Sequence, residues 1–268
     1  MSTQNSTLLD SHFLSVQWII YKTIAKKEVL RIIRIWKMTV LPPAVNTYLF
    51  CLIFGKILGS KIGNIAGADY ISYIAPGLIM NIVIVESFNN LASSVLIEKY
   101  HHAIDDLVAS PAHELAILLG LVTGGIFRAF FAAGIAGMVA FGMAGILPLH
   151  PLLFFYSVII TSLVLSLLGL ITGLYAQRFD EIPTIPTFIL TPLAFFSGIF
   201  YDIQRLPEPW YSLSWLNPMC YMVDTFRYGA IGITYHDISL GLVVISALGV
   251  LLLFFCYHLL KIGYGLKH

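Results

Sequence analysis

Residues 151–176 read PLLFFYSVIITSLVLSLLGLITGLYA, a stretch without any Asp, Glu, Lys or Arg. A helix needs about 20 consecutive apolar residues to cross the hydrocarbon core of a bilayer. We therefore predict a transmembrane helix here. Working outward along the chain, we find further apolar stretches at residues 38–58, 72–96, 116–147, 182–200 and 239–260.

The composition of the whole chain agrees with a location in the membrane. Hydrophobic residues make up 58% of the chain and charged residues 11%, whereas a soluble domain has roughly 45–50% and about 25%. One water-soluble core could not cover that much apolar surface, so lipid must solvate part of it. We predict an all-α membrane protein with six transmembrane helices.

Two of the six stretches are unusual. The stretch 182–200 contains Pro183, Pro186 and Pro192, and prolines are tolerated in a membrane helix when neighbouring groups satisfy the freed carbonyls. We expect a kinked helix there. The stretch 116–147 is longer than one crossing requires, so we expect it to tilt or to extend into water.

Basic residues set the predicted orientation. They are densest in residues 22–37, directly before the first span, and cytoplasmic loops carry an excess of Lys and Arg. We therefore place the N-terminus in the cytoplasm, and six spans return the C-terminus, with Lys261 and Lys267, to the same side. This divides the chain into a cytoplasmic segment, residues 1–37, and a six-span membrane domain, residues 38–268. Arg205 and Arg227 fall on the outside, so the second half supports this orientation less well.

The N-terminal segment has helical periodicity. Its apolar positions follow steps of three and four, from Trp18 through Tyr21 and Ala25 to Trp36. This pattern is typical of an amphipathic helix lying in the membrane surface, with its cations toward anionic headgroups. The predicted interfacial residues are Trp18, Lys22, Lys26, Lys27, Arg31 and Arg34. The alternative is an amphipathic helix packed on protein.

A polar connection follows the second span at residues 97–114. Tyr100, Ile104, Leu107 and Val108 share one helical face there, and Pro111 ends the helix. We interpret this short helix as a docking surface, and the alternative is a solvated connection. The pair His101-His102 fits a solvent-facing position better than a metal site.

The connection at residues 201–238 is longer than most. Its middle is too apolar for a free loop and too short to cross the membrane, which predicts re-entrant or interfacial helices. Asp224 and Arg227 are three residues apart and would lie close together on one of them.

Two ionisable residues, Glu86 and Arg128, fall inside predicted spans. Counted from the cytoplasmic ends of their helices, both lie at a depth of about 15–18 Å, so adjacent helices could pair them. An ionised side chain at this depth usually has a partner or faces water. The sequence leaves open whether they form a structural ion pair, line a substrate path, or do neither. Asn81, Asn89 and Asn90 make part of the span at residues 72–96, which contains Glu86, polar. This favours a face of that span turned toward protein or a cavity.

Several chemistries have no sequence pattern in this chain. No G-x-x-x-x-G-K-[ST], HExxH, GxSxG or EF-hand motif occurs, so we expect no nucleotide site of that kind, no catalytic residues and no metal. Cys51, Cys220 and Cys256 are isolated from one another and fit apolar packing. No basic run has the interleaved aromatics that would indicate nucleic-acid binding. The first residues do not form a cleavable signal.

Several stretches resemble the type-two ABC exporter permease family. One is YIAPGL at residues 73–78, and another is LVASP at residues 107–111. The most specific is a series that begins with PTFILTP at residues 186–192 and FSG at 196–198. It continues with LP at 206–207, LNP at 216–218 and DTFRYG at 224–229. The resemblance covers roughly residues 15–265, and within the family the chain resembles the bacterial Yad-type inner-membrane permeases.

The resemblance implies a half-transporter of the bacterial inner membrane that forms a homodimer. Each copy would bind one cytoplasmic ATP-binding cassette subunit, which would hold ATP and Mg. The coupling helix would fall at residues 98–110, and the re-entrant helices at residues 202–235. The family has no catalytic residue on this subunit, and it offers no counterpart for Arg128. The residues carried over are Glu98, Tyr100, Ile104, Asp105, Leu107 and Val108 for coupling, and Pro218, Asp224 and Arg227 for the re-entrant segment.

The function expected from these observations is ATP-driven export by alternating access. The cargo would be hydrophobic, amphipathic, or linked to a lipid or glycan. A secondary transporter or channel is the alternative, although we find neither an ion-coupling constellation nor an inverted repeat. A membrane-embedded enzyme would need clustered His or carboxylates at one depth, where the spans offer only Glu86.

Overall fold

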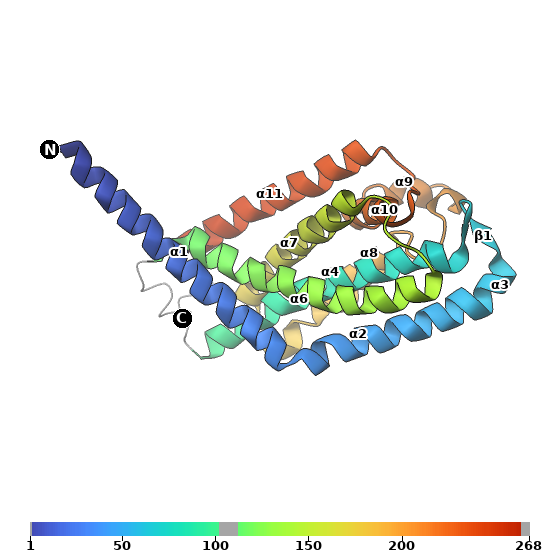
Figure 1. The fold of residues 1–268 in the computed structure, drawn as a ribbon, viewed down its shortest axis with the longest axis horizontal. Helices are drawn as coiled ribbons and strands as arrows, with labels where there is room; N and C mark the ends of the chain where they lie inside the picture. The colour runs from blue at the N-terminus through green and yellow to red at the C-terminus, as the bar shows by residue number, and fades with distance from the viewer. Residues whose placement is uncertain (1, 102–111, 264–268) are drawn as a thin grey trace.

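The computed structural model describes residues 2–101 and 112–263, and its helices run mostly along one long axis (Figure 1). The longer helices are α1 (Ser2–Arg34), α2 (Trp36–Phe50), α4 (Tyr70–Tyr100), α6 (Glu114–Ala144), α7 (Pro151–Tyr175), α10 (Pro218–Ile231) and α11 (Ile238–Ile262). Between α2 and α4 lie η1 (Cys51–Leu58), α3 (Gly59–Ile62) and a small antiparallel hairpin of β1 (Asn64–Ile65) and β2 (Ala68–Asp69). Between α7 and α10 lie η2 (Phe179–Glu181), η3 (Pro186–Leu190), α8 (Thr191–Phe195), η4 (Ile203–Arg205) and α9 (Trp210–Ser214).

Five helices of the described chain are long and apolar enough to cross a bilayer. They are Trp36–Gly55, Tyr70–Tyr100, Glu114–Ala144, Pro151–Tyr175 and Ile238–Ile262. Each overlaps one of the predicted apolar stretches, so the all-α membrane fold is confirmed. Gly145 ends α6 in the left-handed conformation (φ 67°), slightly before the predicted limit of that stretch.

The predicted span at 182–200 is interrupted. Only residues 184–195 are helical, and twelve residues rise about 18 Å, less than the roughly 30 Å of a hydrocarbon core. The π-helical turn η3 begins at Pro186, and α8 has Pro192 in its first turn, because proline removes the backbone donors that a regular helix needs. The expected irregularity is present, but the count of six spans is not confirmed.

Helix α4 lies at the centre of the bundle. In its most apolar stretch 67% of the residues are buried, against 22% for the helices that contain α2 and α11. It packs mainly between α6 and α7. Gly169 of α7 lies against the Phe88 carbonyl of α4, where a Cβ atom would overlap the backbone. Small residues at such contacts allow membrane helices to approach closely.

The bundle has two distinct ends. At the first end, which we call the α1 end, Lys99 Nζ donates to the carbonyl oxygens of Leu174 and Ala176 at 2.8 and 2.9 Å. At the other end, the α10 end, Tyr73 Oη donates to the Tyr201 carbonyl at 3.0 Å. The segment after α7 therefore passes from the α1 end to the α10 end (Figure 1).

Helix α10 has well-defined limits. Asn217 caps its N-terminus by accepting a hydrogen bond from Met219 N at 3.0 Å, Pro218 occupies the first turn, and Gly232 ends the helix with φ 73°. The helix packs against α4, α7 and α11, and most of its side chains are buried. The predicted helices of the 201–238 connection are thus present as α9 and α10, whereas their depth in a membrane stays a prediction.

Candidate functional site

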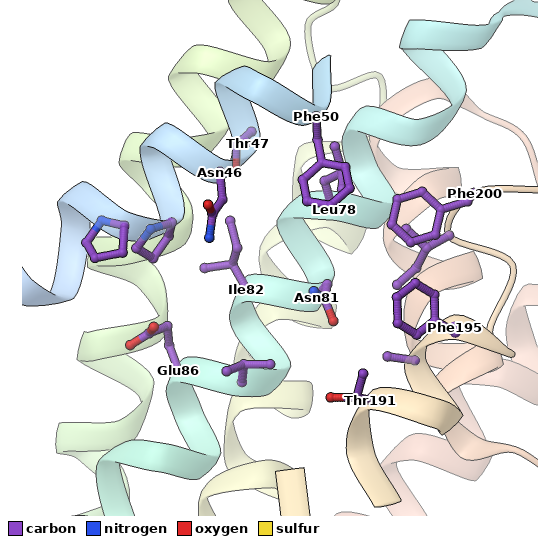
Figure 2. Close-up of a pocket in the computed structure, with 15 residues that line it drawn as sticks. Asn46, Thr47, Phe50, Leu78, Asn81, Ile82, Glu86, Thr191, Phe195 and Phe200 are labelled. Atoms are coloured by element: carbon purple, nitrogen blue, oxygen red, sulfur yellow. The ribbon is translucent and has the colours of Figure 1, made fainter. Parts of the chain in front are cut away.

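A groove of about 300 Å³ opens between α2, α4 and α8 (Figure 2). Its polar groups come from all three helices: Asn46 and Thr47 from α2, Asn81 and Glu86 from α4, and Thr191 from α8. The remaining lining is apolar and includes Pro42, Pro43, Phe50, Leu78, Ile82, Val85, Ala194, Phe195, Ile199 and Phe200. A mostly apolar cleft with a few convergent polar groups is typical of a small-molecule site.

Aromatic rings form one wall of this groove. The Phe200 ring lies 5.8 Å from Phe50, 5.9 Å from Phe54 and 5.6 Å from Phe195, measured between ring centroids. In Figure 2 the rings of Phe50, Phe195 and Phe200 stand on the side of the groove away from Glu86. The groove therefore offers an apolar, aromatic part and a polar part a few helical turns apart.

Glu86 and Arg128 meet at the polar part of the groove. Arg128 Nε, on α6, donates to Glu86 Oε2 at 2.7 Å, and the two side chains are only 16% and 13% exposed. Pairing lowers the cost of placing either charge inside a membrane helix. Glu86 also lines the groove. The ion pair is therefore present, whereas a role of the pair in a substrate path stays a prediction.

A row of polar residues runs along one face of α4, from the groove to the α1 end. Its members are spaced four residues apart, so they stack on successive helical turns. We call them the α4 polar row: Glu86, Asn90, Ser94 and Glu98.

The α4 polar row contacts α1 at three positions. Lys27 Nζ donates to Glu98 Oε1 at 2.7 Å. Ser94 Oγ donates to Glu28 Oε1 at 2.8 Å. Arg31 Nη2 donates both to Asn90 Oδ1 at 3.0 Å and to Glu28 Oε2 at 2.7 Å. The N-terminal helix is therefore bound to α4 by a series of charged and polar contacts.

Burial shifts the pKa values of the Glu28–Arg31 pair. Burial raises the pKa of the Glu28 carboxyl, and the neighbouring Arg31 charge and the Ser94 hydroxyl partly oppose that rise. Burial likewise lowers the pKa of the Arg31 guanidinium, with Glu28 opposing and Arg128 adding to the shift. Arg128 is thus close enough to repel Arg31.

The faces of α1 differ from the predicted arrangement. The helix packs against α6 through the face that carries Ile24 and Glu28, whereas Trp18, and Trp36 at the start of α2, are exposed. The side chain of Arg31, predicted to face lipid headgroups, is 26% exposed and turned toward α4. Lys22, Lys26 and Arg34 remain exposed, and a position of α1 in the membrane surface stays a prediction.

Of the residues predicted for coupling, the structure describes two. Glu98 and Tyr100 belong to the last turn of α4, where Tyr100 stacks on Phe179 with ring centroids 5.1 Å apart. Ile104, Asp105, Leu107 and Val108 lie outside the described residues.

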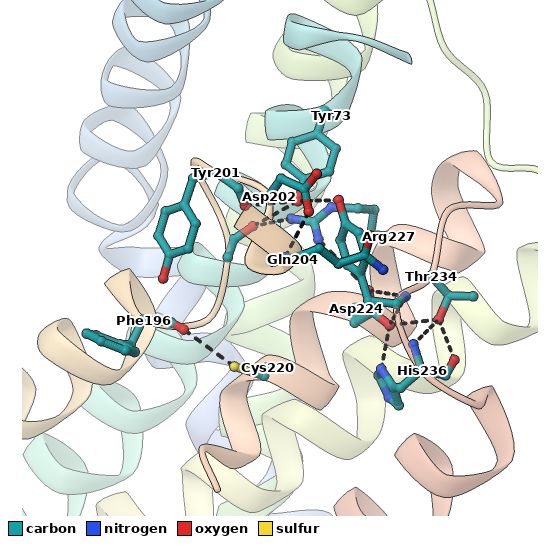
Figure 3. Close-up of polar contacts among 12 residues, drawn as sticks. Tyr73, Phe196, Tyr201, Asp202, Gln204, Cys220, Asp224, Arg227, Thr234 and His236 are labelled. Atoms are coloured by element: carbon teal, nitrogen blue, oxygen red, sulfur yellow. Dashed lines mark hydrogen bonds and ion pairs between the residues drawn. The ribbon is translucent and has the colours of Figure 1, made fainter. Parts of the chain in front are cut away.

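A second polar cluster joins the segments at the α10 end (Figure 3). Arg227 Nη2 donates to the Gly198 carbonyl at 2.6 Å, and its guanidinium lies over the Tyr73 ring at 4.1 Å. Asp224 accepts from Thr234 Oγ1 at 2.7 Å. His236 Nδ1 lies 2.6 Å from an Asp224 oxygen, an ion-pair distance without hydrogen-bond geometry.

The two predicted partners on α10 are therefore bound mainly to other groups. Arg227 Nη1 and Asp224 Oδ1 are 4.0 Å apart, at the limit of an ion pair, while their shorter contacts reach the 198–201 turn and the segment before α11. Arg227 and Asp224 connect three segments rather than only stabilising their own helix.

The sequence-based prediction missed three residues of these contacts. Glu28 is the one acidic residue in a basic stretch, and that exception to the charge pattern could have identified it. Gly120 and Gly124 are four apart on α6, and a Cβ on either would collide with Ile24 or Glu28 of α1. Their spacing is typical of close helix contacts in membranes.

The described residues hold no group of three or more His, Cys, Asp or Glu side chains that could bind a metal. Within the same part of the chain the three cysteines are buried and unpaired.

The five long apolar helices define a multi-pass membrane protein, and a groove opens between three of its helical segments. Residues 20–231 match the ABC-2 type transporter family, and the chain belongs to this family. It is 36% identical to the inner membrane transport permease YadH of Escherichia coli (strain K12) over 261 residues, which cover 95% of this chain and 99% of that permease. Nodulation protein J of Sinorhizobium fredii (strain NBRC 101917 / NGR234) is 27% identical over 190 residues, which cover 68% of this chain and 69% of that protein. The chain is thus a membrane-spanning member of the ABC-2 type transporter family, and the family predicted from the sequence is confirmed.

Proposed function

We propose that the chain is the membrane subunit of an exporter driven by a separate ATP-binding cassette subunit. Two copies of the permease would form a homodimer and bind two copies of the ATPase. The cargo is an amphipathic or lipid- or glycan-linked molecule that leaves the cytoplasm or the inner leaflet. ATP and Mg belong to the partner subunit.

The groove between α2, α4 and α8 is the observation that carries this proposal. Its aromatic wall suits an apolar portion of a ligand, and Asn46, Asn81 and Thr191 offer hydrogen bonds to a polar portion. At the polar end of the groove, the Glu86–Arg128 pair adds two opposite charges that cancel each other. Such a lining favours an amphipathic cargo over a small inorganic ion.

The exposed faces beside the groove support dimerisation. Val45 of α2, Phe188 of η3 and Phe195 of α8 are 53%, 75% and 55% exposed. A second copy that covers this side would enclose the groove between two permeases. Helix α10 would then be the re-entrant helix, and residues 182–200, of which only 184–195 are helical, would form the sixth crossing.

Transport in this proposal follows alternating access. ATP binding brings the two partner subunits together, and the coupling helices at residues 98–110 pass this motion to α4. The direction of transport requires that the cargo binds the two conformations with different affinities. The N- and C-termini lie in the cytoplasm, where the partner subunits are located.

Co-purification with an ATPase tests this function. A tagged permease extracted in mild detergent should bring along a separate ATP-binding cassette protein. The double change Ile104→Asp and Leu107→Asp should release that protein, because it places two charges in the apolar docking face. Leu149→Asp is the matched control, since Leu149 is 62% exposed at the α10 end and the change should leave binding intact. Purification without any ATPase, or undiminished binding after the double change, contradicts the proposal.

The alternative, a secondary transporter or channel, makes a different prediction. It requires a path that works with an ion gradient alone. Movement of a cargo in vesicles that hold only the permease and a proton or sodium gradient would favour that alternative.

A further inference from the structure

The contacts between α1 and the α4 polar row lie between the predicted coupling segment and the groove. The proposed function requires that a movement of the first region reaches the second. Glu98 lies at the start of the predicted coupling segment, and Glu86 lines the groove. Twelve residues separate them within α4, a rise of about 18 Å along the helix axis. The intervening members, Asn90 and Ser94, are fully buried.

Glu28 is the centre of these contacts. Its carboxylate accepts from Ser94 at 2.8 Å and from Arg31 at 2.7 Å, and its side chain is 1% exposed. Arg31 in turn reaches Asn90. A single α1 side chain thus binds one turn of α4 directly and the next turn through Arg31.

Helix α6 packs against the Glu28 contacts from a third side, beside α1 and α4. A Cβ on Gly124 would stand 2.6 Å from Glu28 Cβ, so this position admits glycine alone while α1 keeps its place. Arg128, one turn further on α6, binds Glu86. The charges of Arg31 and Arg128 repel each other across this junction, and each is compensated by its own carboxylate.

We propose that Glu28 is a positioning residue that makes α1 and α4 move as one unit, so that a displacement at the α1 end reaches Glu86 in the groove. This inference rests on the proposed function, because it assumes that an ATPase moves the α1 end. A buried, charge-compensated contact resists sliding, since separating its partners leaves uncompensated charges in a region of low dielectric constant.

A cysteine reporter in the groove tests the inference. Thr191→Cys places a thiol on the exposed lining of α8, and the three native cysteines are buried, so the parental chain gives the background. The measurement is the rate of maleimide labelling in the permease–ATPase complex, with and without ATP plus orthovanadate. We expect ATP to change that rate by at least about fivefold.

Glu28→Ala in the reporter background should remove the ATP effect while ATP hydrolysis and ATPase binding persist. A merely structural residue would change the amount of folded protein and leave the response of that folded protein intact. Glu28→Gln, which keeps the hydrogen bond from Ser94, should retain part of the response. Lys26→Ala is the control on the exposed face of the same helix.

A matched glycine pair gives a second measurement that stands even if Glu28→Ala does not fold. Gly124→Ala should displace α1 from α6 and reduce the ATP effect, whereas Gly134→Ala should not, because nothing lies within 4 Å of a Cβ there. A full ATP effect in Glu28→Ala or in Gly124→Ala overturns the inference and leaves the proposed function standing. No ATP effect in the parental reporter overturns both.

Discussion

Six charged side chains meet between α1, α4 and α6, and their signs balance. The three cations are Lys27, Arg31 and Arg128, and the three anions are Glu28, Glu86 and Glu98. Removing a charge from water is costly, and a partner at hydrogen-bond distance offsets most of that cost. At the scale of single residues, the arrangement is therefore sensitive to the loss of one partner and tolerant of the loss of both.

The Glu86–Arg128 pair gives the first prediction. Arg128→Met should destabilise the folded protein by about 3 kcal/mol, because Glu86 stays in the bundle without its partner. Adding Glu86→Gln should recover most of that loss. Unfolding in detergent micelles, followed by circular dichroism, measures both effects. Equal stability of the parental protein and the single variant would contradict the importance of this pair.

The raised pKa of Glu28 gives a prediction about pH. Because this pKa lies above the ordinary value of 4.5, the folded protein takes up a proton at a higher pH than the unfolded chain does. The contribution of Glu28 to the free energy of unfolding therefore grows as the pH falls from neutral toward 4.5 and is lost as the pH rises.

Comparison with Glu28→Gln isolates this contribution, since glutamine does not titrate. The stability of the parental protein relative to Glu28→Gln should be greater at pH 5 than at pH 7, measured by denaturant titration at both pH values. A difference that is constant, or that shrinks at pH 5, means that the pKa of Glu28 is not raised.

At the scale of elements, the sequence predicted five of the apolar helices because length and composition alone decide a membrane span. The sequence did not predict the conformation of residues 182–200. Three prolines interrupt a regular helix there, and tertiary contacts decide which irregular form the segment takes. Glu86 and Arg128 were recognised because charge is rare in such helices. The contact face of α1 was not recognised, because a basic amphipathic helix has the same sequence pattern whether it lies on lipid or on protein.

Close helix contacts give a prediction for α7 and α4. Gly169→Ala should destabilise the fold by about 1–3 kcal/mol, because its Cβ would overlap the Phe88 carbonyl. Gly142→Ala on α6 meets nothing within 4 Å and should be neutral or stabilising by up to about 1 kcal/mol through helix propensity. Thermal unfolding of both variants in the same detergent checks this. Equal effects at the two positions would show that α4 and α7 are less tightly packed than described.

At the scale of the whole molecule, α4 connects every functional feature. It carries Glu98 near the predicted coupling loop, Glu86 in the groove, and Tyr73 in the cluster with Arg227 at the α10 end. Helix α10 and the 198–201 turn are bound to its other end by Arg227 and Tyr73. A movement of α4 relative to α2 and α8 would change the groove, because these three helices form its walls.

The claim that this groove opens alternately to the two sides of the membrane is tested most directly by sided labelling of the Thr191→Cys reporter. The complex is placed in vesicles of known orientation and exposed to a membrane-impermeant maleimide. We predict labelling from one side without nucleotide and from the opposite side with ATP plus orthovanadate. Labelling from the same side in both states would contradict alternating access through this groove.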